Sequence, residues 1–214
     1  IASAALVYDT SVFGGTSPVL GQRYRFEVGG SAGSLSYGNL LLDYRRYFRV
    51  AKPLILAGRF LHYGRYGGDA EDPRLQDLFV GYPSLVRGYD ANTFSAAECG
   101  PNAAQTGTCP VFDQLLGSRM AVANVEARIP LLGALGIIPS RSIPPVEMAF
   151  FYDAGVAWTG ADGARLFGNG SRRIVTSAGV SLRMNLLGYA IGQMDIVHPF
   201  DRPEKNWMVR FSLT

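Results

Sequence analysis

The residues best placed to do chemistry lie in one long segment near the middle of the chain. Arg87 stands at the centre of the run Leu85-Val86-Arg87-Gly88-Tyr89. A guanidinium presents five N–H donors in a planar fork and binds carboxylates through paired hydrogen bonds. The surrounding segment, residues 64–117, has no strand character, and a loop of about fifty residues is rare in a compact domain unless it is functional or disordered. The fold must therefore be one that can carry such a loop.

The sequence contains no recognisable catalytic set. There is neither a G-x-S-x-G nucleophile motif nor an H-E-x-x-H metal motif. His62 and Asp43 could both lie on strands, but a lone histidine is more often structural or interfacial. A barrel hydrolase is the least favoured reading, and we predict no enzyme activity, no cofactor and no metal.

The two cysteines, Cys99 and Cys109, lie ten residues apart inside the long segment. A metal site would need further ligands, but both histidines, His62 and His198, are far away in the sequence. We therefore expect a disulfide that closes a short loop, which implies an oxidising compartment. On the chain-entropy estimate such a bond stabilises the fold by roughly 2–3 kcal/mol.

The rest of the chain alternates with a period of two, which is typical of β-strands with two different faces. One face of these segments is apolar, and the other carries charged residues such as Glu126, Arg128, Glu147, Asp153 and Arg183. We read nine strand-like segments, at residues 1–10, 22–29, 36–50, 53–63, 118–129, 146–158, 173–184, 190–198 and 206–214.

These strands favour a transmembrane barrel over a soluble sandwich, although a sandwich would also alternate. The segments suit the ~9–11 residues of a tilted strand that spans a bilayer. Aromatic residues cluster near strand ends, where a membrane girdle would lie. They are Tyr63, Tyr66, Trp158 and Trp207. No apolar run approaches the ~20 residues of a spanning helix, so a membrane location would have to use a barrel.

The composition bounds the class of protein further. A chain of 214 residues with 26 glycines and 17% charged residues suits a single all-β domain, residues 1–214. The net charge of +3 does not indicate nucleic-acid binding, because the arginines alternate along strands and do not cluster on one element. The chain lacks an initiator Met and a secretion signal, so we expect a processed form or a fragment.

Four motifs in order resemble BamA-type outer-membrane assembly and translocation proteins of the bacterial surface antigen superfamily, in their C-terminal barrel part. The run Leu85–Tyr89 resembles the VRG(F/Y) motif of the family's long loop. The segments that resemble its following strands are Gly117–Pro130 (GSRMAVANVEARIP), Phe150–Gly155 (FFYDAG) and Ser177–Arg183 (SAGVSLR). A cysteine pair ten apart also occurs in some members. The resemblance runs from about Leu6 to the C-terminus.

The resemblance implies a role for the loop. In the family the loop folds into the barrel lumen, and its arginine meets acidic residues of the two following strands. Carried over, Arg87, Gly88 and Tyr89 form the docking segment, and Arg87 pairs with Asp153 and Glu126. The alternation agrees, because both carboxylates point away from the apolar face. The bacterial outer membrane is the implied location.

The family also has a seam between its terminal strands. The matching residues here are Leu6, Tyr8, Trp207, Val209, Phe211 and Leu213. The last strand departs from the family pattern, since it lacks a kinking glycine and ends on Thr214 instead of an aromatic residue. A seam as labile as the family's is therefore in doubt. Nothing in the chain resembles the family's periplasmic POTRA domains.

The number of strands is unusual for this family, whose barrel has sixteen. Single-chain bacterial barrels have an even number of strands, and a barrel of about eight holds little besides its own side chains. Strands could precede this chain, the first segment could lie outside an eight-strand ring, or two copies could pair edge to edge. We expect a small barrel of about eight strands with possible self-association into a homodimer.

The favoured function is insertion or translocation of outer-membrane proteins through the seam, by addition of an incoming strand. The alternatives are a membrane anchor or secretion barrel for a separate N-terminal domain, which could be an enzyme, and a passive barrel. The implied partners are outer-membrane lipid and lipopolysaccharide, client outer-membrane proteins and a periplasmic domain outside this chain; nucleic acid is not expected.

Overall fold

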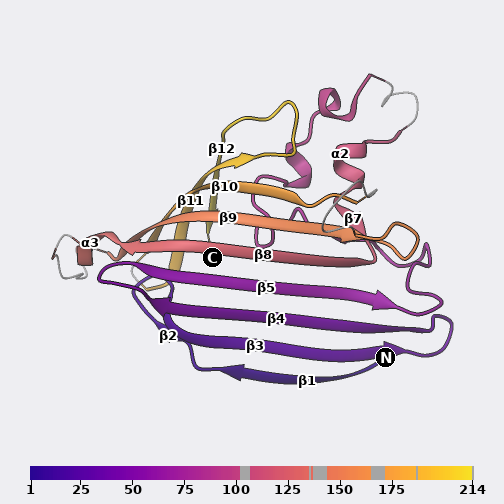
Figure 1. The fold of residues 1–214 in the computed structure, drawn as a ribbon, viewed down its shortest axis with the longest axis horizontal. Helices are drawn as coiled ribbons and strands as arrows, with labels where there is room; N and C mark the ends of the chain where they lie inside the picture. Colours follow the sequence, from indigo (N-terminus) through magenta and orange to yellow (C-terminus); the bar gives the residue numbers. More distant parts are fainter. Residues whose placement is uncertain (102–106, 135, 137–143, 165–171, 187, 214) are drawn as a thin grey trace.

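The computed structural model describes the whole chain except residues 102–106, 135, 137–143, 165–171, 187 and 214. Its main feature is one antiparallel sheet in which each long strand pairs with the next one along the chain (Figure 1). The long strands are β1 (Ala2–Asp9), β3 (Pro18–Ser31), β4 (Tyr37–Arg49), β5 (Ile55–Tyr66), β8 (Arg119–Pro130), β9 (Val146–Trp158), β10 (Val175–Leu186), β11 (Ala190–Pro199) and β12 (Met208–Leu213).

The nine long strands correspond to the nine segments predicted from the alternation. β1 pairs with β3 over eight residues, and the rings of Tyr8 and Tyr24 stack at 5.2 Å. The first segment therefore belongs to the sheet, and the alternative that places it outside a ring of eight strands does not hold. A short strand, β2 (Val12–Phe13), also pairs with β3.

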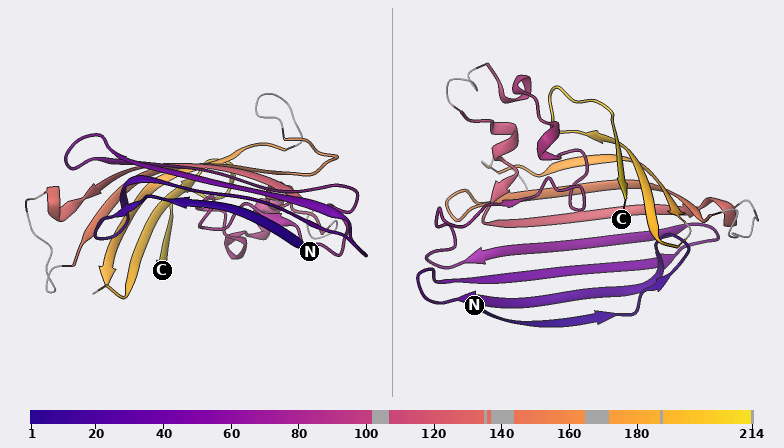
Figure 2. Two further views of the ribbon diagram at one scale, coloured as in Figure 1. Left: turned by 90° about the horizontal axis from the view of Figure 1, so that it is seen from below. Right: turned by 180° about the vertical axis from the view of Figure 1, so that it is seen from behind.

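The sheet is curved, and β1 and β12 are its two edges (Figure 2). Within the described ranges no ladder joins these two strands. Among the same residues, no helix is both long and apolar enough to cross a membrane. In the described part of the chain there are two short α-helices, α2 (Pro110–Asp113) and α3 (Leu131–Ala134).

The two faces of the sheet differ as the alternation requires. Its convex outer face carries large apolar side chains that are exposed to the surroundings. Such a band is unfavourable in water and favourable in lipid, so this face is the membrane face. Its exposed residues include Leu6, Phe26, Val28, Phe60, Val125, Phe150, Leu182, Ile196, Val209 and Phe211.

Aromatic residues mark one rim of the outer face. Each of the two histidines lies against a tryptophan: His62 stacks on Trp158 at 5.6 Å, and His198 lies 5.3 Å from Trp207. Amphipathic rings of this kind favour a membrane interface. Tyr63 does not belong to the girdle, because it points to the other face and packs against the loop core.

The two residues considered for a hydrolase do not meet. His62 lies on the outer face, where its Nε2 is 2.7 Å from the Tyr66 hydroxyl. Asp43 points to the opposite face, where it accepts hydrogen bonds from Arg45 and Arg59. A sheet separates the two side chains, so they form no catalytic pair.

The long loop between β5 and β8 lies on the concave face of the sheet (Figure 2). β5 extends to Tyr66, three residues beyond the predicted end at residue 63, because Gly64 still pairs with Arg119. The loop is also not wholly irregular. It contains β6 (Leu78–Phe79), η1 (Ala91–Thr93), η2 (Ala96–Cys99) and α2, and β6 pairs with β7 (Leu116–Gly117).

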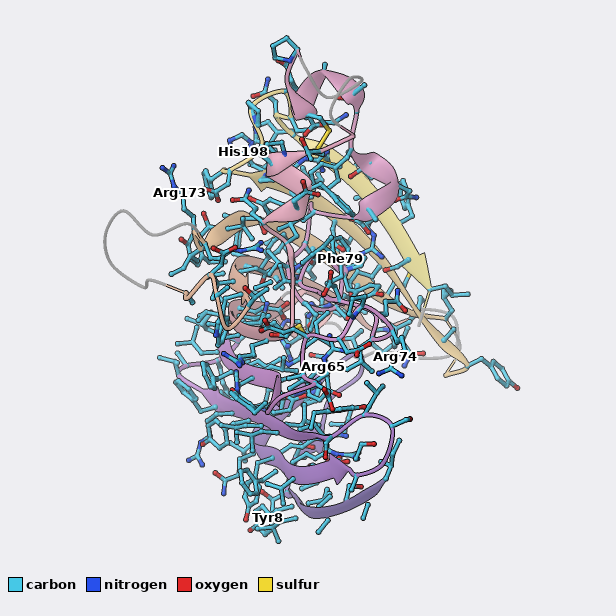
Figure 3. The ribbon with its side chains drawn as sticks, turned by 90° about the vertical axis from the view of Figure 1, so that its right-hand side faces the viewer. Tyr8, Arg65, Arg74, Phe79, Arg173 and His198 are labelled. Atoms are coloured by element: carbon cyan, nitrogen blue, oxygen red, sulfur yellow. A yellow bond between two sulfur atoms is a disulfide. The ribbon has the colours of Figure 1, made fainter. Side chains whose placement is uncertain are left out.

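The loop has its own apolar core, which packs on the sheet. Phe79 of β6 belongs to this core and lies well away from Tyr8 on the edge strand β1 (Figure 3). Residues buried in this contact come from the loop (Val80, Leu85, Val86, Tyr89, Leu115) and from strands β5 to β10 (Leu61, Val122, Ala157, Val175). The loop therefore covers the half of the concave face toward β8–β10.

A matched pair of substitutions tests which face meets lipid. Val125 on the outer face and Val7 on the concave side of β1 are 55% and 56% exposed. We expect Val125→Arg to lower the free energy of unfolding by about 2–4 kcal/mol, the penalty of an arginine near the bilayer midplane. Val7→Arg should have little effect. Urea unfolding in lipid bilayers measures both, and equal effects would contradict the assignment of the faces.

Candidate functional site

The run that carries Arg87 enters the concave face as a tight turn. The backbone N–H groups of Leu85 and Val86 both donate to the carbonyl of Tyr82. The Val86 side chain then fills space left by Gly155 of β9, where an added Cβ would lie 2.5 Å from a Val86 methyl. Gly88 has a positive φ of 88°, which favours glycine. These features turn the Arg87 side chain toward the sheet.

The Arg87 guanidinium binds Asp153 of β9 in a bidentate pair. Nε donates to Oδ2 at 2.7 Å, and Nη2 donates to Oδ1 at 2.8 Å. Nη1 donates to Glu126 Oε1 of β8 at 2.9 Å and to Ser181 Oγ of β10 at 3.2 Å. The guanidinium also lies 3.5 Å from the ring centroid of Phe151. One loop side chain thus contacts three neighbouring strands.

Glu126 extends this contact into a network of buried charges. It also accepts from Arg183 of β10 at 2.8 and 2.9 Å and from Arg128 at 2.7 Å. Arg183 Nη1 in turn donates to Glu147 at 3.2 Å. Glu126 and Glu147 therefore each have a guanidinium partner, as Asp153 has in Arg87.

Asp153 and Ser181 each make a further hydrogen bond, Asp153 with Asn124 and Ser181 with Asp195. Asn124 Nδ2 donates to Asp153 Oδ1 at 2.8 Å and to the carbonyl of Leu85 at 2.7 Å, so it joins the strand to the loop backbone. Ser181 Oγ makes a short hydrogen bond to Asp195. Asp153 and Asp195 are fully buried. Buried charges persist only when they are paired and hydrogen-bonded.

Tyr89 anchors the other end of the docking segment. Its hydroxyl donates to the carbonyl of Thr176 at 2.8 Å and lies 3.2 Å from Asp201 Oδ2. Burial raises the pKa of the Tyr89 phenol, so the ring stays neutral. The segment is therefore held on both sides of Gly88.

The sequence did not single out every member of this site. Arg128, Arg183 and Glu147 lie on the charged face that the alternation identifies, but nothing in their spacing assigns them to Arg87. Glu98 and Arg202 were missed altogether. They form a bidentate ion pair at 2.8 and 2.9 Å between the loop and the β11–β12 connection. Only the folded path of the loop brings them together.

The cysteines form a disulfide, Cys99–Cys109, with a Cα–Cα distance of 4.4 Å. This confirms the predicted bond. It joins the end of η2 to the start of α2, next to Glu98. In the part of the chain that the structure describes, no group of three or more His, Cys, Asp and Glu side chains could hold a metal ion.

The residues assigned to a seam lie on the two edges of the sheet. Leu6 and Tyr8 are on β1, Val209, Phe211 and Leu213 are on β12, and Trp207 directly precedes β12. All six side chains are substantially exposed. The described residues do not bring the two groups together, and Thr214 lies outside the description.

Comparisons with known proteins identify one family and one fold. The model of the Omp85 superfamily domain matches residues 8–211. The crystal structure of BamA from Haemophilus ducreyi lacking POTRA domains 1–3 superposes with a TM-score of 0.68 at 18% sequence identity. The likeness covers 99% of this chain and 42% of that chain, so the present chain spans about two fifths of its length.

The buried network predicts a large effect from a small change at Asp153. Asp153→Asn keeps the shape of the side chain but leaves Arg87 without its main anion. We expect the free energy of unfolding to fall by about 3–5 kcal/mol, as for a buried pair that loses one partner. Asp72→Asn is the control, since Asp72 pairs with Arg74 at the surface. Equal effects of the two variants on urea unfolding would contradict the network's role.

The disulfide provides a second stability test. The double variant Cys99→Ala and Cys109→Ala should lower the free energy of unfolding by roughly 2–3 kcal/mol, because the unfolded loop gains entropy. Unfolding of the oxidised protein and of the double variant under the same conditions measures the difference. A variant as stable as the parent would show that the loop is already ordered without the bond.

Proposed function

Because this chain belongs to the Omp85 superfamily, we propose that it assists the insertion or translocation of other proteins at the outer membrane. The family and the fold that the motifs implied are confirmed, and the protein is an outer-membrane β-barrel protein. The proposed partners are client outer-membrane proteins, lipid with lipopolysaccharide, and a periplasmic domain outside this chain.

The observation that carries the proposal is the docked loop. Arg87 reaches across the concave face and ties the loop to β8, β9 and β10 through fully or largely buried groups. A loop that only covered the surface would gain nothing from burying the Arg87 guanidinium, which is unfavourable to desolvate. Such a network suits a loop whose position on the sheet matters to the activity.

The loop covers only part of the concave face. On β1, β3 and β4 the polar side chains of this face remain partly exposed, among them Asp9 and Arg23, whose pair is 3.7 Å long and open to solvent. The loop fills the β8–β10 side of the concave face, and it does not fill the β1 side. This asymmetry supports a protein that assists insertion, in which the loop occupies one half of the concave face and the other half stays accessible. It argues against a uniform pore.

The edge strand β12 offers backbone groups with which a client strand could form hydrogen bonds. β12 has a neighbour on the β11 side, and the described residues give it no partner on the other. An open edge presents alternate N–H and C=O groups, to which an incoming strand can add by main-chain hydrogen bonds. Because the apolar side chains of Val209, Phe211 and Leu213 face the lipid, a client strand that pairs with β12 would lie within the hydrocarbon layer of the membrane.

A crosslinking experiment tests the edge directly. The full-length protein carries a single additional cysteine at Val209 on β12, or at Phe26 on the interior strand β3 as the matched outer-face control. A client barrel with cysteines in its terminal strands is then inserted into vesicles that contain either variant. We expect disulfide adducts at Val209→Cys and few at Phe26→Cys. Insertion without adducts at Val209 would contradict the use of this edge.

Loss of the docking arginine should impair the activity. We expect Arg87→Ala to slow client insertion by more than about tenfold, because a change of ~1.4 kcal/mol in the docked state already corresponds to that factor. Arg74→Ala, which removes an exposed loop arginine, should insert clients normally. The rate of client insertion into vesicles measures both, and an unimpaired Arg87→Ala variant would remove the loop from the mechanism.

A further inference from the structure

A second arginine binds the docking loop from the opposite side. Arg202 lies in the connection between β11 and β12, and its side chain is completely buried together with that of Glu98. The pair joins residues 104 positions apart in the sequence. Neither residue takes part in the Arg87 network, so this is a separate attachment of the loop.

All five N–H donors of Arg202 have acceptors. Nε and Nη2 bind the two oxygens of Glu98 at 2.8 and 2.9 Å. Nη1 donates to the Gly88 carbonyl and to Thr93 Oγ1, both at 2.8 Å, and Nη2 also donates to the Thr93 carbonyl at 2.9 Å. The guanidinium further lies 3.8 Å from the centroid of the Phe94 ring. Because every N–H group of the planar guanidinium is hydrogen-bonded, both its orientation and its position are fixed.

The loop holds Glu98 ready for this contact. Ser95 donates its backbone N–H to Glu98 Oε1 at 2.9 Å, and the two residues form a capping box at the start of η2. The next residue, Cys99, is held by the disulfide. Burial alone would raise the pKa of Glu98, but hydrogen bonds from Arg202 and Ser95 hold it below its usual range.

The contact reaches the docking motif and the edge strand together. Gly88, which accepts from Arg202, directly follows Arg87. The neighbouring Asp201 meets the Tyr89 hydroxyl at 3.2 Å. On the strand side, Arg202 touches Met208 Sδ at 3.9 Å, and Arg210 of β12 pairs with Asp90 of the loop at 3.4 Å. The connection 200–207 is therefore bonded to the loop at one end and continues into β12 at the other.

We propose that Arg202 is a positioning residue that couples the docked loop to the pairing of the edge strand β12. β12 is only six residues long, so its ladder with β11 is short. With Arg202 held by the loop, the start of β12 is fixed, while the ladder with β11 is the support that the described residues give to its other end. The role of this coupling in activity rests on the proposed function, in which β12 is the strand that receives a client.

Hydrogen exchange on the full-length protein in lipid bilayers tests the coupling without any client. We expect Arg202→Gln to speed exchange of the β12 amides by about tenfold or more, because local opening sets the exchange rate. The amides of β8 and β9 should not change. Arg74→Gln serves as the control, since Arg74 contacts only the loop and the neighbouring turn near Ser34. Glu98→Gln gives the same test in a milder form if Arg202→Gln does not accumulate.

A rescue separates positioning from general stability. Gln193 and Ser212 are Cα partners across β11 and β12. A disulfide between Gln193→Cys and Ser212→Cys should restore slow exchange of β12 in the Arg202→Gln protein. Unchanged β12 exchange with faster loop exchange, or faster exchange throughout the sheet that the crosslink does not reverse, would overturn the proposal. Because no insertion is measured, failure here is distinct from failure of the proposed function.

Discussion

The structure depends on the pairing of charges that water cannot reach. Arg87 enters the concave face on a loop, and a guanidinium in that position is tolerated only if carboxylates meet it in good geometry. Asp153 and Glu126 do so from adjacent strands, and Glu126 in turn requires Arg183 and Arg128. Among the described residues Arg87 is the cation that pairs with Asp153, so its removal leaves that fully buried carboxylate without an ion-pair partner. The loop, β8, β9 and β10 are therefore held as one unit, and the space inside the curved sheet is occupied on that side.

The membrane imposes the complementary constraint on the outer face. Strands that alternate between lipid and a polar interior must place every second residue against hydrocarbon, and the exposed side chains of Phe60, Val125 and Phe150 meet that requirement. The same alternation delivers the charged residues to the concave face at regular positions. The lipid face and the buried network are thus two results of one period-two pattern. The pattern does not explain how the edge of the sheet is held. There β12 is short, and the contact of Arg202 with the loop gives it additional support.

Much of this could be predicted from the sequence, and the limits have physical causes. Alternation located the nine long strands to within a few residues and assigned Glu126 and Asp153 to the polar face, because side-chain direction along a strand follows from backbone geometry alone. The end of β5 was placed three residues too early because Gly64 is a common turn residue. In the structure Gly64 pairs with Arg119 of β8, and the Arg65 N–H donates to the carbonyl of Ser118 just before β8. The contact of Glu98 with Arg202 was not predictable, since neither residue follows a periodic pattern and the loop's path is set by tertiary packing.

A double-mutant cycle on Arg87 and Asp153 measures most directly whether this pair holds the loop to the sheet. The free energy of unfolding is determined for the parent protein, Arg87→Leu, Asp153→Leu and the double variant, all in the same lipid bilayer. A coupling energy above about 1 kcal/mol is expected, because contacting residues in one network depart from additivity by roughly 0.5–3 kcal/mol. Single effects that add to within about 0.5 kcal/mol would show that the two residues act independently and would contradict the docking of the loop through Arg87.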